Sequence, residues 1–194
     1  MSAKVDNIPM AASTLEELKT QHPADQDLWV FGYASLIWRP EFAYSEQHLT
    51  RVHGWHRALK MWSRINRGTP EQPGLVFALL PGGSCQGMVF RIPAAQAVQA
   101  LERLWAREMP RPVYTPRWLP CPIPGKTVQA LAFTLPRSSP SYTGSLSPAQ
   151  YRNIFAQASG RFGTTLDYAR NTFESLRELG IEDRALQALL SHAP

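Results

Sequence analysis

The chain has 194 residues, of which 44% are hydrophobic, and it carries 20 Lys and Arg residues against 15 Asp and Glu residues. This length and this apolar content predict one domain with a sizeable hydrophobic core. The net charge of +5 is modest and scattered, which disfavours a nucleic-acid-binding protein with a basic patch and suits an anionic small molecule as well as an ordinary surface.

The first predicted element is a short helix near the N-terminus. The segment Ser13–Glu16 resembles a capping box that opens a helix, and Pro23 would end that helix. We interpret residues 1–24 as an N-terminal appendage and residues 25–194 as the domain itself.

Strand-like segments dominate the next hundred residues. Short apolar or alternating runs predict strands at residues 28–31, 55–62, 75–80, 86–92 and 128–135. Gly82 and Gly83 stand between two of these runs and indicate a hairpin. Because one helix alone interrupts the series, the pattern predicts an α+β domain with a small curved or barrel-like mixed sheet, and not repeated βαβ units.

That helix is predicted over residues 93–108, with Pro93 at its first position. Projected at roughly 100° per residue, its apolar side chains form one stripe, which consists of Ala97, Val98, Leu101, Leu104 and Trp105. Glu108 falls inside this stripe, whereas Arg107 falls on the opposite side. An inward carboxylate is desolvated, its pKa rises, and it becomes a candidate general base. The alternatives are a Glu108 buried in an ion pair and a frayed last turn that exposes it.

The C-terminal part is predicted to be helical. Residues 137–147 are rich in Ser, Pro and Gly and indicate a loop. Ser147 and Pro148 then form an N-cap and a first-turn proline, and the helical segment extends over residues 147–194. It contains three predicted helices, which begin near Ser147, near Thr165 and near Asp183.

Other features bear on compartment and cofactors. No window approaches the roughly 18 apolar residues of a membrane span, and the N-terminus lacks the apolar run of a signal peptide. Two cysteines, Cys85 and Cys121, make no disulfide framework. His53 and His56 would point to opposite faces of a strand, so we expect no metal site there. We therefore expect a cytoplasmic protein with no cofactor, no nucleic-acid partner and no membrane partner. The sequence does not indicate an oligomeric state.

Four segments, in order between residues 28 and 190, carry a resemblance to a known family. They read FGYASLIW, GWHRALKMWSRINRGTPEQPG, LWAREMPRPVYTPRW and ASGRFGTTLDYARNTFESLRELGIED. In these segments the chain resembles the ChaC family of γ-glutamylcyclotransferases, in its glutathione-specific branch. The resemblance implies that the free α-amine of a γ-glutamyl amide attacks the side-chain carbonyl carbon. Glutathione would then give 5-oxoproline and cysteinylglycine.

The resemblance also implies roles for individual residues. Glu108 matches the catalytic glutamate of the family. The glutamyl-binding loop of the family is matched by Phe31, Gly32, Tyr33, Ala34, Ser35 and Leu36. Two departures stand out. Ala34 replaces a glycine, which would cost about 1 kcal/mol if that position needs a positive φ. The segment after Glu108 keeps Tyr114 and lacks the glycine that usually precedes the tyrosine.

Several alternatives remain open from the sequence. Arg57 shares a strand face with Trp55 and could meet a substrate carboxylate or form a structural ion pair. Ser35 could be an ordinary turn serine. At the level of function, the alternatives are a cyclotransferase for another γ-glutamyl amine and an inactive module that binds a γ-glutamyl compound.

Overall fold

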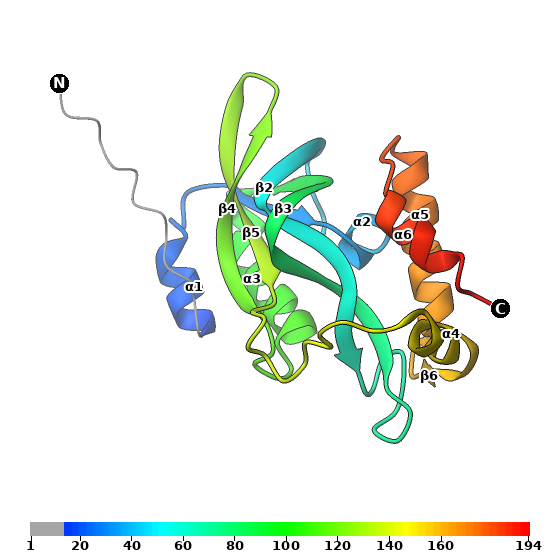
Figure 1. Ribbon diagram of the computed structural model, residues 1–194. Coiled ribbons are helices and arrows are strands. Elements are labelled where there is room, and N and C mark those ends of the chain that lie inside the picture. The colour runs from blue at the N-terminus through cyan, green and yellow to red at the C-terminus, as the bar shows by residue number, and fades with distance from the viewer. Residues whose placement is uncertain (1–13) are drawn as a thin grey trace.

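The computed structural model describes residues 14–194 as one curved sheet with helices on both sides (Figure 1). The helices are α1 (Leu15–Gln21), α2 (Ser35–Trp38), α3 (Ala94–Glu108), α4 (Pro148–Gln157), α5 (Thr165–Glu178) and α6 (Arg184–Leu190). The strands are β1 (Leu28–Gly32), β2 (Glu46–Ser63), β3 (Gly74–Ile92), β4 (Thr115–Ile123), β5 (Lys126–Thr134), β6 (Ser159–Gly160) and β7 (Gly163–Thr164). The predicted α+β class with a curved mixed sheet is confirmed.

The main sheet has five strands in the order β2-β3-β1-β5-β4. The β1–β5 pair is parallel, and the β1–β3, β2–β3 and β4–β5 pairs are antiparallel. The hairpin predicted at Gly82 and Gly83 is wrong, because β3 runs through both glycines without a turn. Their φ angles of 101° and 72° bend β3 beside a register shift between His53 and Trp55 in β2. Two long strands therefore curl together, and the chain reverses between them at residues 64–73.

Strand β4 has no counterpart among the predicted strands. It contains Pro116, Pro120 and Pro122, and proline cannot donate a hydrogen bond to a neighbouring strand. β4 lies at the edge of the sheet and pairs only with β5, which is where proline is tolerated. The edge position of β4 therefore explains how a segment with three prolines, which its sequence did not indicate as a strand, can still form one.

Strand β1 connects the two sides of the sheet. All five of its residues are buried, and successive side chains point to opposite faces. Leu28 and Val30 belong to a cluster that includes α1 and α3, whereas Trp29 and Phe31 belong to the cluster that includes the C-terminal helices. This double burial explains the continuous apolar sequence of β1 and places its C-terminal end inside the molecule.

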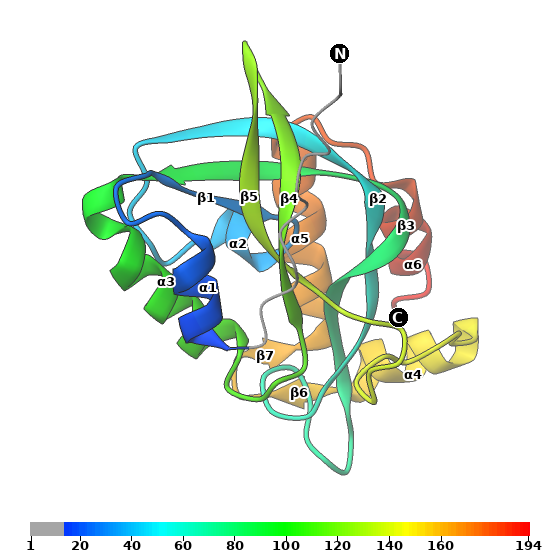
Figure 2. The ribbon, with the colours of Figure 1, turned by 90° about the vertical axis from the view of Figure 1, so that its left-hand side faces the viewer.

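Helix α3 packs beside α1 (Figure 2), and Leu18 of α1 lies in the same core cluster as Leu101 and Leu104. Val98 was predicted on the apolar stripe and is exposed, so the stripe is narrower than its sequence indicates. The capping box of α1 forms between Thr14 and Glu17. The predicted box began at Ser13, which lies outside the described residues. The division at residue 24 stays a prediction.

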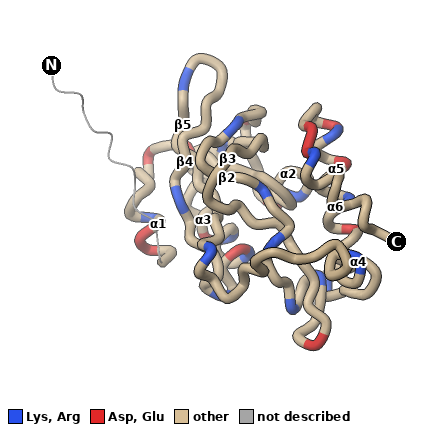
Figure 3. Tube along the Cα trace, in the orientation of Figure 1, with Lys and Arg blue, Asp and Glu red and all other residues tan. Residues whose placement is uncertain are grey.

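The charged residues lie over many elements. Figure 3 shows Lys and Arg distributed over strands, helices and loops of the described chain. Within residues 14–194, no helix combines the length and the apolar content that crossing a membrane requires.

Candidate functional site

Glu108 is the last residue of α3, and its side chain is 18% exposed. Burial raises the pKa of Glu108, and the charge of Glu41 raises it further, while the Arg107 guanidinium opposes both effects. The inward position agrees with the helical projection. A carboxylate with a raised pKa holds a proton more readily than an exposed one, which suits a group that accepts and returns a proton.

Arg107 lies in the site, so the prediction that it points to the opposite side is wrong. Its Nε is 3.1 Å from Glu108 Oε1, and its Nη2 donates to Ser35 Oγ at 3.1 Å. Its Nη1 donates to the Arg39 carbonyl at 2.7 Å and contacts Glu41 Oε2 at 3.0 Å. The long side chain folds back from the last helical turn. Arg107 therefore fastens the start of α2 and the segment after it to the C-terminal end of α3.

The loop after β1 brings the predicted binding residues next to this arginine. Gly32 ends β1, and a Cβ there would come within 3.1 Å of both Leu36 and Phe90. The glycine thus lets α2 pack closely on the strand. Ala34 has a φ of −146°, which is outside the left-handed region, and it is buried. The substitution of alanine for the family's glycine therefore brings no positive-φ cost.

Three tyrosines, Tyr33, Tyr114 and Tyr168, lie close enough to Glu108 for its charge to act on them. The Tyr33 hydroxyl donates to the Phe133 carbonyl at 3.0 Å, and a hydrogen bond joins Tyr33 to Tyr114. Tyr168 of α5 has a hydrogen bond with Ser35. Burial raises the pKa of Tyr33 and Tyr114 well above 10 and raises that of Tyr168 to about 12, and the charge of Glu108 adds to each shift. All three phenols are therefore protonated donors at neutral pH.

Tyr168 is a site residue that the sequence reasoning missed. It lies in the segment DYARNT, which belongs to the family resemblance. It also lies on the buried face of α5 with Ala169, Thr172 and Leu176, and a tyrosine on such a face is typical of an ordinary core. The available signal was its place within a family motif, and no spacing rule distinguishes it from a core residue.

Arg57 makes the structural ion pair, which was one of its two open interpretations. Its Nη2 lies 2.7 Å from Asp183 Oδ2, with the two side chains 5% and 15% exposed. Its Nη1 donates to the Tyr33 carbonyl at 2.8 Å and to the Gln86 carbonyl at 3.1 Å. Arg57 therefore supports the binding loop from behind and connects it to the residue that caps α6. A contact between Arg57 and substrate stays a prediction.

Two cavities lie away from Glu108. One of about 440 Å³ is lined by Arg57, Asp183 and the apolar face of α6. The other, of about 600 Å³, lies between the end of α1 and strands β1, β4 and β5, where His22 stacks on Trp118. Neither cavity is lined by Tyr33, Tyr114 or Tyr168. The candidate site is therefore defined by Glu108, Arg107 and these three tyrosines.

Comparisons with known proteins agree with the family resemblance of the sequence. The family model described as "ChaC-like protein" matches residues 28–193. A glutathione-specific γ-glutamylcyclotransferase of Escherichia coli K12 is 34% identical over 180 residues, which cover 92% of this chain and 78% of the relative. Glutathione-specific γ-glutamylcyclotransferase 1 of Homo sapiens is 31% identical over 175 residues, which cover 85% and 78%.

A crystal structure supports the fold independently. The γ-glutamylcyclotransferase specific to glutathione from yeast superposes with a TM-score of 0.76 at 20% sequence identity. The match covers 86% of this chain and 97% of the yeast protein. At this level of identity the similarity establishes a shared fold, and the chemistry has to be argued from the residues of this chain.

Proposed function

This chain belongs to the ChaC-like protein family, and from this premise we propose that it is a glutathione-specific γ-glutamylcyclotransferase. The reaction is a lyase-type elimination with ring closure. The α-amine nitrogen of glutathione bonds to the γ-carbonyl carbon, and the amide bond to cysteine breaks. The products are 5-oxoproline and cysteinylglycine. Because nucleophile and electrophile share one molecule, much of the entropy of bringing them together is already lost.

Proton transfer is the main demand on the protein. At neutral pH the α-amine is an ammonium, which cannot attack until it loses a proton. In the proposed mechanism Glu108 takes this proton and delivers it to the leaving nitrogen of cysteine. The second proton, which the attacking nitrogen loses on ring closure, follows the same route, so that cysteinylglycine leaves as an ammonium and Glu108 is ionised again. The raised pKa of Glu108 supports both roles, because it lies closer to neutral pH than that of an exposed glutamate. These steps need no cofactor.

The loop of residues 31–36 is the proposed holder of the glutamyl end. The first N–H groups of a helical turn have no acceptor within that turn, and α2 begins at Ser35. These groups and the protonated phenol of Tyr168 are candidate donors to the α-carboxylate and to the developing oxyanion. Arg107 donates a hydrogen bond to the Ser35 hydroxyl, so the loop is held in a fixed position relative to Glu108.

One observation carries the proposal. A buried carboxylate with a raised pKa stands next to the glutamyl-binding loop, and Arg107 joins the two. We also propose a cytoplasmic setting, where thiols stay reduced, since both Cys85 and Cys121 are unpaired.

The test is incubation of the purified protein with millimolar glutathione, followed by mass spectrometry of 5-oxoproline and cysteinylglycine. A parallel incubation contains γ-glutamylalanine, which keeps the glutamyl end and lacks the cysteinylglycine. We expect both products from glutathione and little 5-oxoproline from γ-glutamylalanine. Equal turnover of the two would contradict glutathione specificity, and no product from either would contradict the enzyme.

A further inference from the structure

The cavity of about 440 Å³ lies on the side of the sheet that carries α4 and α6 (Figure 1). Its volume is within the range of small-molecule sites in proteins. Its apolar lining comes from β2, β3, α4, α6 and the segment before α4, and it consists of Leu59, Phe77, Leu146, Tyr151, Leu186 and Leu189. Water in such a hollow stays in contact with hydrocarbon, so a ligand with an apolar body is favoured there.

An ion pair separates this cavity from the glutamyl-binding loop. Arg57 lines the cavity, and its Nη1 donates to the Tyr33 carbonyl of the loop at 2.8 Å. Its Nη2 lies 2.7 Å from Oδ2 of Asp183, which is also part of the lining. Asp183 Oδ1 accepts from the Leu186 N–H at 2.9 Å. The two charges therefore compensate each other, and the pair leaves no net charge for a ligand.

Lys60 gives the cavity a positive charge that no carboxylate compensates. It lines the cavity and is half-buried. Within residues 14–194, the ion pairs of lysine are those of Lys19, and the Lys60 ammonium has no hydrogen-bond or ion-pair partner. The carboxylate of the lining belongs to Asp183, which is already paired with Arg57. A ligand that carries a negative charge is therefore attracted to the part of the cavity near Lys60.

We propose that this cavity is a binding site for a small amphipathic carboxylate, with its apolar body between β2 and α6 and its carboxylate at Lys60. The volume of the cavity limits that body to a compact one. The apolar lining disfavours glutathione itself, because its peptide groups would lose their hydrogen bonds with water there. The site is therefore separate from the one that contains Glu108, and the inference does not rest on the proposed function.

The experiment measures the binding of two probes to the full chain by ligand-observed NMR titration. One probe is hydrocinnamate, a phenyl ring on a short aliphatic chain that ends in a carboxylate, and the other is its neutral amide. We expect saturable binding of both and about fivefold tighter binding of the carboxylate, because a charge-assisted hydrogen bond to a half-buried lysine is modest. In Lys60→Met this ratio of dissociation constants should fall to about one. The ratio is measured within one preparation, so the fraction of folded protein cancels.

Matched variants test whether the probes bind in this cavity. Ala185 of α6 lines the cavity, so Ala185→Phe should fill its mouth and abolish saturable binding of both probes. Ala188 lies about one turn further along α6 and is exposed, so Ala188→Phe should bind both probes as the wild-type protein does. Lys126 lies over Trp29, which lines the other cavity. Lys126→Met should therefore keep the wild-type ratio of dissociation constants.

Several results would overturn the inference. They are an absence of saturable hydrocinnamate binding by the wild-type protein, equal affinity for the two probes, and unchanged binding in Ala185→Phe. A ratio of dissociation constants that survives Lys60→Met, or that falls in Lys126→Met, would place the carboxylate elsewhere and overturn it too. If Ala185→Phe does not fold, the two lysine variants still decide the question. Because every readout is binding, a failure of the proposed cyclotransferase activity would leave this inference in place.

Discussion

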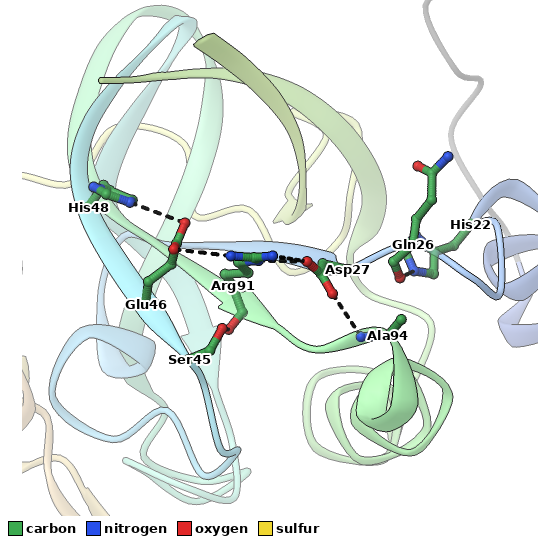
Figure 4. Close-up of polar contacts among 8 residues, drawn as sticks. All are labelled: His22, Gln26, Asp27, Ser45, Glu46, His48, Arg91 and Ala94. Carbon is green, nitrogen blue, oxygen red and sulfur yellow. Dashed lines mark hydrogen bonds and ion pairs between the residues drawn. The ribbon is translucent and has the colours of Figure 1, made fainter. Parts of the chain in front are cut away.

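The two ends of helix α3 each carry a carboxylate paired with an arginine, and the two pairs behave in opposite ways. At the N-terminal end, Asp27 accepts from the Ala94 N–H at 2.9 Å and pairs with Arg91, which also contacts Glu46 (Figure 4). These contacts lower the pKa of Asp27. At the C-terminal end, Glu108 pairs with Arg107, and yet its pKa is raised.

Burial and the helix dipole explain this difference. The Asp27 and Arg91 side chains are 29% and 39% exposed, whereas those of Glu108 and Arg107 are 18% and 20% exposed. Asp27 lies at the positive end of the helix, where a carboxylate is favoured, and Glu108 lies at the negative end, where it is not. An ion pair alone therefore does not show what a carboxylate does. The direction of its pKa shift agrees with a stabilising role for Asp27 and with the proton transfer proposed for Glu108.

The largest expected effect is on turnover. Glu108→Gln removes the base and keeps the shape, so the rate of 5-oxoproline release from glutathione should fall about a hundredfold or more. Asp27→Asn makes the matched change at the other end of α3 and should leave this rate within about twofold. Equal losses of turnover in the two variants would contradict the contrast between the two ends of α3. Near-normal turnover in Glu108→Gln would remove Glu108 from the mechanism.

A stability measurement controls for misfolding. Because the folded-state pKa of Glu108 is raised, its contribution to stability is present at low pH and is lost as the pH rises through that pKa. At neutral pH the ionised carboxylate is therefore a cost to the fold, and glutamine avoids it. Glu108→Gln should unfold in urea at a concentration no lower than the wild-type protein at pH 7.

Some of this arrangement is predictable from sequence. The stripe on α3 predicts an inward Glu108, because helical periodicity carries over the whole helix. The loop of residues 31–36 is predicted from its family motif. The C-terminal helices follow from caps at Ser147 and Asp183. In each of these places local preference and tertiary packing agree.

Other parts depend on contacts that sequence does not encode locally. The continuity of β3 through Gly82 and Gly83 depends on a bend shared with β2. Arg107 points away from the site on a helical projection, but its side chain is long enough to return to Ser35. Tyr168 looks like a core residue until α5 packs against the loop. Long-range packing decided each of these cases.

The second expected effect is a shift in pH dependence. The Arg107 guanidinium favours the ionised form of Glu108, so Arg107→Met should raise the pKa of this carboxylate further. More of the base is then protonated in acid, and the acid limb of the kcat/KM profile for glutathione should move to higher pH. Arg91→Met, at the other end of α3, should leave the limb in place.

The quantity to compare is the pH at which the acid limb of the kcat/KM profile falls, and not the rate itself. Arg107 also anchors the loop, so its loss should lower the rate at every pH. A limb that stays in place or moves to lower pH in Arg107→Met would show that the titrating base is not Glu108. The contrast between a stabilising carboxylate at one end of α3 and a proton-transferring carboxylate at the other would then no longer hold.

The smallest expected effect is on stability at the other end of α3. Asp27 caps α3 from a distant segment through the Ala94 N–H and pairs with Arg91. Asparagine can keep the cap, so Asp27→Asn mainly removes a partly exposed ion pair, which is typically worth up to about 1 kcal/mol. Asp27→Asn should lower the free energy of unfolding by about this amount at pH 7, as measured by urea denaturation. A substitution at Ala94 is the matched control, because the backbone N–H of this residue forms the cap and its side chain takes no part in it.

The pH dependence of that loss gives the sharper test. The folded-state pKa of Asp27 lies below its ordinary value of 3.8, so its contribution is present above that value and is lost as the pH falls through the folded-state pKa. The difference between wild type and Asp27→Asn should therefore stay level from pH 7 down to about pH 5 and shrink as the pH falls further, towards 3. A difference that is constant over this range would mean that the cap acts through shape and not through charge, and Asp27 would then cease to be the electrostatic counterpart of Glu108.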